Sequence, residues 1–209
     1  IDNIYLGPSY SNLEVFNLLK KNNLKFIKAS KPEKFIAKQL HKGSVVACFQ
    51  GRMEFGPRAL GNRSILVSAC NKAVNDWLNK KLKRTEFMPF APITIKKYLD
   101  RMYKNLDGKM TAIKYMTTTV KCTLEANKKS PAAVHIDKTA RPQLISKDDN
   151  LKIYNILKEY FKISKIPNLI NTSFNVHEEP IVCTPNDALR AFKSSKLDYL
   201  YIEDYIVIK

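Results

Sequence analysis

Glycine and arginine are scarce in this sequence, which makes their placement informative. There are 6 glycines in 209 residues, and seven arginines against 29 lysines. Three of the glycines (Gly51, Gly56, Gly61) and three of the arginines fall within residues 49–66. The planar guanidinium of arginine binds phosphate or carboxylate through two parallel hydrogen bonds, which a lysine ammonium does not offer. This stretch is therefore the leading candidate for an anion site, with a surface loop carrying ordinary ion pairs as the alternative.

Other absences exclude several classes of protein. The four cysteines lie far apart, with no CxxC pair and no Cys/His metal spacing, so a structural zinc site and a disulfide framework are both disfavoured. Reduced thiols fit a cytoplasmic protein. We find no signal peptide and no apolar run long enough to cross a bilayer, so no membrane partner is expected. The chain begins at Ile1 rather than Met, which indicates a fragment of a longer protein.

The common nucleotide and hydrolase signatures are also missing. There is no GxxxxGK[ST] loop and no GxGxxG fingerprint, and neither a Ser-His-Asp grouping nor a pair of catalytic carboxylates is readable. An ATP site in this chain would therefore use Arg and Lys clamps. Such a site acts by positioning its ligands and neutralising their charge.

The net charge of +17 favours anionic partners such as nucleotides, RNA or phosphorylated substrates. The lysines are evenly spread, with no run of five or more basic residues, so most of them fit a solvated surface.

Helical and strand patterns mix along the whole chain, which predicts one α/β (α+β) domain with a mixed sheet. Capping boxes at Ser11 and Ser30, and a cap at Thr184, predict helices that start after them. Apolar runs predict strands, which we place at residues 4–7, 44–49, 65–69, 115–124, 132–136, 167–170, 199–202 and 205–208.

Polar residues follow or interrupt the apolar strands at three places. These are the stretch with Arg52, Arg58, Arg63 and Ser64, the loop from His135 to Arg141, and residues 171–175. Asn, Thr and Ser after a strand can present amides, hydroxyls and backbone N–H groups to phosphate oxygens. A capped turn explains residues 171–175 equally well.

The motifs at these places resemble a known family, the NodU/CmcH/TobZ-type O-carbamoyltransferases, in its C-terminal domain. The resemblance covers nearly the whole chain and follows the family's motif order. It rests on residues 51–66 (GRMEFGPRALGNRSIL), 89–92 (PFAP), 135–143 (HIDKTARPQ), 171–175 (NTSFN) and 179–188 (EPIVCTPNDA).

The resemblance implies a YrdC-like fold over residues 1–209, with a twisted mixed β-sheet flanked by helices. It implies that the domain binds ATP, with Mg²⁺, and carbamoyl phosphate, and forms a carbamoyl-adenylate. Transfer to a hydroxyl acceptor would then need an N-terminal domain of the same polypeptide. That domain carries an iron-type metal held by histidine, and nothing in this chain matches it.

The resemblance also assigns the site residues. Arg141, Asn171 and Ser173 are implied as catalytic residues that bind carbamoyl phosphate and the phosphates of the nucleotide. Residues in or near the matching basic and polar motifs are implied to bind substrate or nucleotide, namely Arg52, Arg58, Arg63, Ser64, Lys81, Lys83, Arg84, His135 and Asn175. Which arginines contact phosphate and which brace their own loop is left open, and Glu54 is expected only to pair with a neighbouring Arg. Many members carry an Arg where this chain has Met88.

Two other functions stay open at this point. A basic YrdC-like module that binds RNA is one, although no RNA-reading motif is present. A purely structural half that supports the N-terminal domain is the other. Homodimerisation is left open as well.

Overall fold

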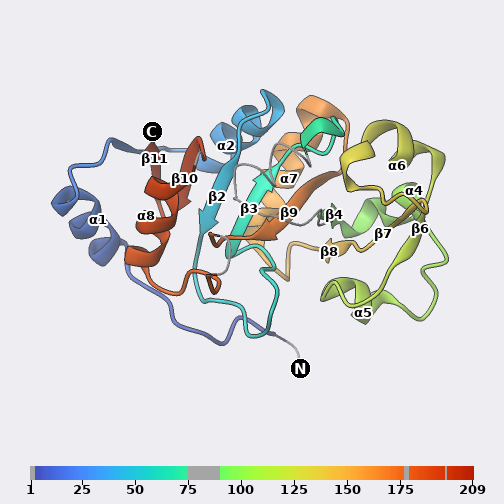
Figure 1. Ribbon diagram of the computed structural model, residues 1–209, viewed down its shortest axis with the longest axis horizontal. Helices are drawn as coiled ribbons and strands as arrows, with labels where there is room; N and C mark the ends of the chain where they lie inside the picture. Colours follow the sequence, from blue (N-terminus) through green and yellow to red (C-terminus); the bar gives the residue numbers. More distant parts are fainter. Residues whose placement is uncertain (1–2, 75–89, 177–178, 196) are drawn as a thin grey trace.

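The computed structural model describes residues 3–74, 90–176, 179–195 and 197–209 (Figure 1). Its main element is an eight-stranded sheet in the order β1-β11-β10-β2-β3-β9-β4-β8. Strand β2 runs parallel to β10 and β4 parallel to β8, while the other neighbours are antiparallel. The strands are β1 (Phe26–Lys28), β2 (Val46–Phe49), β3 (Arg63–Val67), β4 (Ala91–Ile95), β8 (Gln143–Ile145), β9 (Asn168–Ser173), β10 (Tyr199–Ile202) and β11 (Tyr205–Ile208). The predicted α/β fold with a mixed sheet is confirmed.

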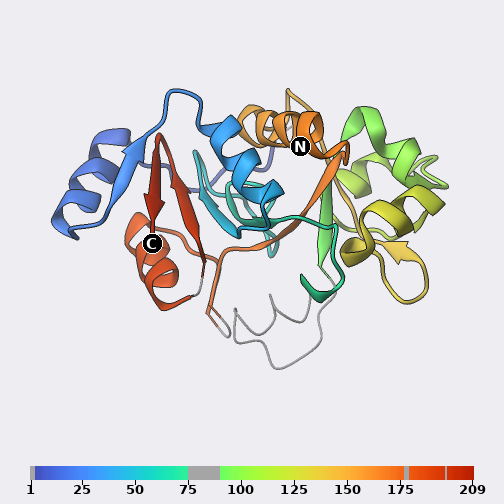
Figure 2. The same cartoon turned by 90° about the horizontal axis from the view of Figure 1, so that it is seen from above.

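Helices cover both faces of this sheet. Alternate residues of a strand point to opposite faces, so Phe49 and Cys48 of β2 enter two different cores. One core packs against α1 and α8, and the other against α2 and α7. Figure 2 shows α2 and α7 on one side of the strands and α8 on the other. These helices are α1 (Asn12–Lys21), α2 (Pro32–His41), α7 (Leu151–Ser164) and α8 (Pro185–Ser194).

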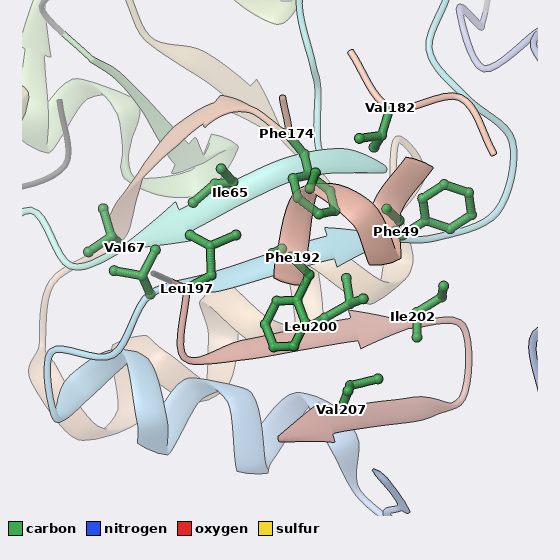
Figure 3. Close-up of a cluster of buried hydrophobic side chains, with 14 of the residues drawn as sticks. Phe49, Ile65, Val67, Phe174, Val182, Phe192, Leu197, Leu200, Ile202 and Val207 are labelled. Atoms are coloured by element: carbon green, nitrogen blue, oxygen red, sulfur yellow. The ribbon is translucent and has the colours of Figure 1, made fainter. Parts of the chain in front are cut away.

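The core beneath α8 is built from residues far apart in the sequence. Phe192 of α8 packs with Phe49, Ile65, Leu200 and other apolar side chains of β2, β3, β10 and β11 (Figure 3). All four of these side chains are buried. Each fully buried apolar side chain of this size stabilises the fold by roughly 1.5–3 kcal/mol, so this cluster holds the central strands in place.

A smaller lobe extends from the β8 edge of the sheet (Figure 1). It has its own three-stranded sheet, β5-β6-β7, and its own apolar core. Its elements are η1 (Lys96–Tyr98), α4 (Leu99–Met102), β5 (Tyr103–Lys104), α5 (Met110–Lys114), β6 (Val120–Cys122), α6 (Leu124–Lys129), η2 (Pro131–Ala133) and β7 (Thr139–Ala140). The lobe matters for the site because β7 leads directly to Arg141.

Most locally encoded elements match their sequence predictions, but the capping box predicted at Ser30 is wrong, because α2 begins after Lys31 without a side-chain capping hydrogen bond. The Ser11 hydroxyl accepts a hydrogen bond from Glu14 N at 3.2 Å, and the Glu14 carboxylate accepts one from Ser11 N at 2.7 Å. Thr184 and Asp187 form the same reciprocal cap at the start of α8. The last two strands, β10 and β11, have the predicted bounds. These elements were predictable because their signals lie within a few adjacent residues.

The strand predicted for residues 115–124 is wrong over most of its length, because only Val120–Cys122 forms a strand. Met116 has a φ of +54°, a left-handed conformation that ends any extended run. Its buried side chain packs with Leu60 and Ala91. Packing between distant segments has overridden the local preference of β-branched residues for a strand.

Two further predicted strands are not strands. The first two residues of the segment 132–136 belong to the 3₁₀ turn η2, and Ala132 N donates a hydrogen bond to Ala69 O at 3.1 Å. The segment 4–7 is extended but pairs with a loop, since Gly7 N donates to Met53 O at 2.9 Å and Phe55 N to Ile4 O at 2.8 Å.

Gly61 yields a test of how tightly the β2–β3 connection packs on α7. Its φ is +125°, and a Cβ there would lie 2.9 Å from Ile153 Cγ1 and 3.2 Å from Asn150 Nδ2. Gly61→Ala should therefore lower the free energy of unfolding by about 2–4 kcal/mol, through backbone strain and overpacking together. Urea denaturation measures the change.

Gly56→Ala is the matched control. Gly56 lies in the same connection with a φ of +117°, but nothing lies within 4 Å of an added Cβ. It should show only the backbone strain, about 1–2 kcal/mol. Equal losses in the two variants would contradict the close approach of Gly61 to α7.

Candidate functional site

Residues 50–62 connect β2 to β3, and we call them the arginine loop. Because β2 and β3 are antiparallel neighbours, both ends of the loop lie at the same end of the sheet (Figure 1). The loop contains Arg52 and Arg58 and is followed at once by Arg63 and Ser64 of β3. The candidate site is therefore built on a hairpin connection between adjacent strands.

A buried carboxylate shapes the arginine loop. Oε1 of Glu54 accepts hydrogen bonds from Leu60 N and Asn62 N, both at 2.7 Å, and from Arg63 N at 3.2 Å. Glu54 is 5% exposed. The expectation that Glu54 pairs with a neighbouring arginine is thus wrong: it satisfies main-chain donors that would otherwise be buried without partners.

Arg63 braces the same loop from the other side. Its guanidinium donates to the carbonyls of Gln50 at 2.8 Å, Gly51 at 3.2 Å, Asn62 at 3.2 Å and Pro8 at 3.3 Å. It also stacks on the ring of Phe49, with 3.6 Å between Cζ and the ring centroid. Arg63 is fully buried. Of the two roles that the sequence left open for it, the geometry favours bracing the loop.

Asn171 and Gln143 hold the far side of the loop. Nδ2 of Asn171 donates to Ala59 O at 3.1 Å and to Gln143 Oε1 at 2.7 Å. Nε2 of Gln143 donates in turn to Leu60 O at 2.8 Å. Sequence reasoning missed Gln143 as a site residue, because the contact joins β8 to β9 and the loop and has no local signal.

Two serines complete this support. Ser64 and Ser173 are paired across β3 and β9. The Ser64 hydroxyl accepts from Gly61 N at 2.8 Å, and the Ser173 hydroxyl accepts from Ala59 N at 3.4 Å. Both predicted site residues therefore lie beside the arginine loop.

Arg58, Arg141 and His135 lie near enough for their charges to influence one another. The pKa of Arg141 is lowered first by burial and then by the positive charge of Arg58, and Arg141 in turn lowers the pKa of His135. Nε of Arg141 is buried without a hydrogen-bond partner. Within residues 3–74, 90–176, 179–195 and 197–209, neither Arg58 nor Arg141 forms an ion pair. Two arginines that repel one another without a counter-ion have a charge arrangement that suits an anionic ligand.

His135 has a defined tautomer in this arrangement. The Thr139 hydroxyl donates to Asp137 Oδ1 at 2.7 Å, so it accepts from Nδ1 of His135 at 3.2 Å. A neutral ring then carries its proton on Nδ1 and leaves Nε2 as an acceptor. Burial is the main cause that lowers the pKa of His135 below 6.5. His135 can therefore donate from Nε2 to a phosphate only after it takes up a second proton.

The remaining predicted residues fall into two groups. Arg52 is exposed and donates to Leu6 O at 2.8 Å, and Asn175 donates from Nδ2 to Glu179 O at 2.8 Å. Neither makes a contact that joins it to Arg58 or Arg141. Lys81, Lys83 and Arg84 lie outside the described residues.

Within the described ranges, no three or more His, Cys, Asp or Glu side chains come together as metal ligands would. None of the described helices combines the length and the apolar character needed to cross a membrane.

Comparison with known proteins identifies similar chains. Residues 37–209 match the family described as Carbamoyltransferase C-terminus. The uncharacterized protein MJ1058 of Methanocaldococcus jannaschii is 39% identical over 97% of this chain and 34% of its own length. The nodulation protein NolO of Bradyrhizobium diazoefficiens is 31% identical over 100% of this chain and 39% of its own length. The chain thus spans little more than a third of these relatives.

A solved structure shares the fold. Full-length HypF, described in a phosphate- and nucleotide-bound form, superimposes with a TM-score of 0.60 at 20% sequence identity. The match covers 88% of this chain and 22% of HypF. It confirms the YrdC-like fold implied by the resemblance.

The protonation of His135 yields a prediction at the site. His135 should titrate below 6.5 in the folded protein, as followed by the NMR shifts of its ring. Between its folded pKa and about 6.5 the unfolded chain binds more protons. Its contribution to stability is therefore complete above about 6.5 and is lost as the pH falls through the folded pKa.

Inorganic phosphate should raise the pKa of His135, because a nearby dianion favours the imidazolium and its Nε2 donor. His135→Gln assigns the resonance. Titration at or above 6.5, or a pKa that ignores phosphate, would contradict the placement of His135 beside an anion site.

Proposed function

The chain belongs to the carbamoyltransferase C-terminal family, and we propose that it binds ATP and carbamoyl phosphate and joins the carbamoyl and adenylyl groups into a carbamoyl-adenylate. The observation that supports this most is the pair Arg58 and Arg141, which lie close together without a counter-ion among the described residues. Phosphate groups carried by both substrates suit such a pair. The activity, a carbamoyl transfer to a hydroxyl group, would belong to the longer protein.

The residues of the site would have two kinds of role, binding the ligand or supporting the loop. Arg58 and Arg141 would bind the phosphate oxygens, with His135 as an additional donor once it is protonated. Glu54 and Arg63 would act only through the loop, whose backbone they hold. The chain would accelerate the reaction by bringing two polyanions together and neutralising their repulsion, rather than by moving protons.

The proposed reaction has two balanced steps. Water first cleaves carbamoyl phosphate into carbamate and inorganic phosphate. An oxygen of carbamate then attacks the α-phosphorus of ATP, the bond to the bridging oxygen of the β-phosphate breaks, and pyrophosphate leaves with that electron pair. Mg²⁺ would enter as part of the ATP complex, held by phosphate oxygens, because the described residues offer no cluster of metal ligands.

We propose that residues 1–209 form one C-terminal domain and that an N-terminal domain of the same polypeptide receives the carbamoyl group. The relatives are about 2.5 to 3 times as long as the matched segment, since it covers 34% and 39% of them. An iron-type metal held by histidine would belong to that other domain. All four cysteines of this chain are free, in keeping with the cytoplasmic location that we propose.

Arginine variants test the proposed ligands. Arg58→Ala and Arg141→Ala should each weaken the binding of carbamoyl phosphate and ATP by about 2–4 kcal/mol, because each removes a charge-assisted contact. Isothermal titration calorimetry measures both ligands. Arg190→Ala is the control: Arg190 is an exposed arginine on α8 that pairs with Glu179 and Asp187, and its loss should leave the affinities unchanged. Affinities like the wild type in both site variants would refute the assignment.

The reaction itself gives a second test. Wild-type protein given ATP and carbamoyl phosphate should release pyrophosphate, and Arg141→Ala should release it at least roughly tenfold more slowly. A coupled pyrophosphate assay measures the rate. Salt-sensitive RNA binding without any pyrophosphate release from the full-length polypeptide would instead favour a nucleic-acid module.

A further inference from the structure

Asn171 has an acceptor atom that nothing in the fold uses. The residue is 2% exposed, and its Oδ1 is buried without a hydrogen-bond partner. A buried polar atom without a partner carries an energetic cost, so an amide normally satisfies both of its ends. The unused oxygen therefore calls for an explanation.

The orientation of this amide is fixed by main-chain groups. Ala59 O and Leu60 O can only accept hydrogen bonds. Gln143 must donate to Leu60 O from Nε2, which turns its Oε1 toward Asn171. Asn171 must then present Nδ2 to both Gln143 Oε1 and Ala59 O. A flipped amide would place oxygen against oxygen at both contacts, so Oδ1 is the atom left over.

This orientation changes what Asn171 can bind. Both of its N–H groups are already used within the protein, so it has no donor for a phosphate oxygen. Its free Oδ1 would repel a phosphate and attract an N–H or O–H group. Asn171 therefore does not fit the role of phosphate ligand that the sequence resemblance implied.

Asn175, farther along the same segment, is arranged in a similar way. Its Nδ2 donates to Glu179 O at 2.8 Å, and its Oδ1 is buried without a partner. Asn171 within β9 and Asn175 just after it thus offer acceptors, whereas Arg58 and Arg141 offer donors. A ligand that satisfies both must carry an anionic group and a hydrogen-bond donor.

We infer that Oδ1 of Asn171 accepts a hydrogen bond from the NH₂ of carbamoyl phosphate and so selects this substrate over acyl phosphates that lack the amide. The inference rests on the proposed function. The carbamoyl nitrogen is only a few bonds from phosphorus, whereas the ribose hydroxyls of ATP lie farther from any phosphate. Asn171 contacts Ala59, which directly follows Arg58, so a phosphate on Arg58 brings the carbamoyl group toward Asn171.

Oδ1 is buried in this structure, so a ligand reaches it only after groups around it move. Arg58 and Arg141 are partly exposed and form no ion pair within the described part of the chain. Their side chains can shift without breaking such a pair. Arg63, bonded to four carbonyls, would keep the loop backbone in place during this shift.

The test compares two ligands that differ in a single group. Acetyl phosphate carries a methyl where carbamoyl phosphate carries NH₂. Wild-type protein should bind carbamoyl phosphate at least roughly tenfold more tightly, since a methyl leaves Oδ1 unsatisfied. Asn171→Ala should reduce this ratio to near one. Titration calorimetry with each ligand gives the ratio for every protein.

Gln143→Met is the matched control for the structural role of Asn171. It removes the same inter-side-chain hydrogen bond and loosens the loop, but leaves the hydrogen bond from Asn171 Nδ2 to Ala59 O, which keeps Oδ1 as the free atom. Both ligands should weaken by a similar factor, and their ratio should stay at the wild-type value. A ratio that falls equally in both variants would overturn the inference, because loop support alone would then explain it.

The wild-type measurement decides the matter even if Asn171→Ala does not fold. Equal binding of the two ligands overturns the role of Asn171 while leaving the proposed function intact. Binding of neither carbamoyl phosphate nor ATP overturns both. A tenfold or greater preference for carbamoyl phosphate supports both.

Discussion

The arginine loop keeps its shape because buried side chains satisfy its backbone. A loop of this length exposes many main-chain donors and acceptors, and each one that is buried without a partner costs free energy. Glu54 accepts from three N–H groups at the end of the loop, and Arg63 donates to carbonyls at both ends and to Pro8. The carboxylate of Glu54 and the guanidinium of Arg63 thus bind the backbone of the loop, and these hydrogen bonds hold the loop in its position on the sheet.

Arginines of the same motif have different roles because their side chains lie in different surroundings. Arg63 belongs to β3 and points back under the loop, where carbonyls surround its guanidinium. Arg58 lies on the loop itself and meets Arg141, which follows the smaller lobe. The arginine that braces the loop (Arg63) and the arginine proposed to bind an anion (Arg58) are therefore only a few residues apart in the sequence. The proposed anion site lies where the arginine loop of the main sheet comes near Arg141, which follows β7 of the smaller lobe.

The strand β9 connects these parts. Its Asn171 contacts the loop and β8, and its Ser173 contacts the loop and pairs with Ser64. Its Ile170 and Leu169 lie in the cores on opposite faces of the sheet. Since β9 is a central strand held by neighbours on both sides, it has little freedom to adjust to a ligand. Rigid placement on a strand is what a site needs if one amide oxygen is to distinguish similar substrates.

The sequence by itself determined the class of fold, the capped helices α1 and α8, the last two strands and the importance of the arginine loop. These follow from signals within a few residues: capping pairs such as Ser11 and Glu14, apolar runs, and scarce residues gathered in one stretch. The tertiary structure alone decided that residues 115–124 are mostly not a strand, and that Glu54 caps the loop. It also decided that Gln143 turns Asn171 so that only an acceptor is free. Each of these results depends on contacts between segments that are far apart in the chain. A local sequence pattern does not indicate which distant carbonyl or amide a side chain will contact.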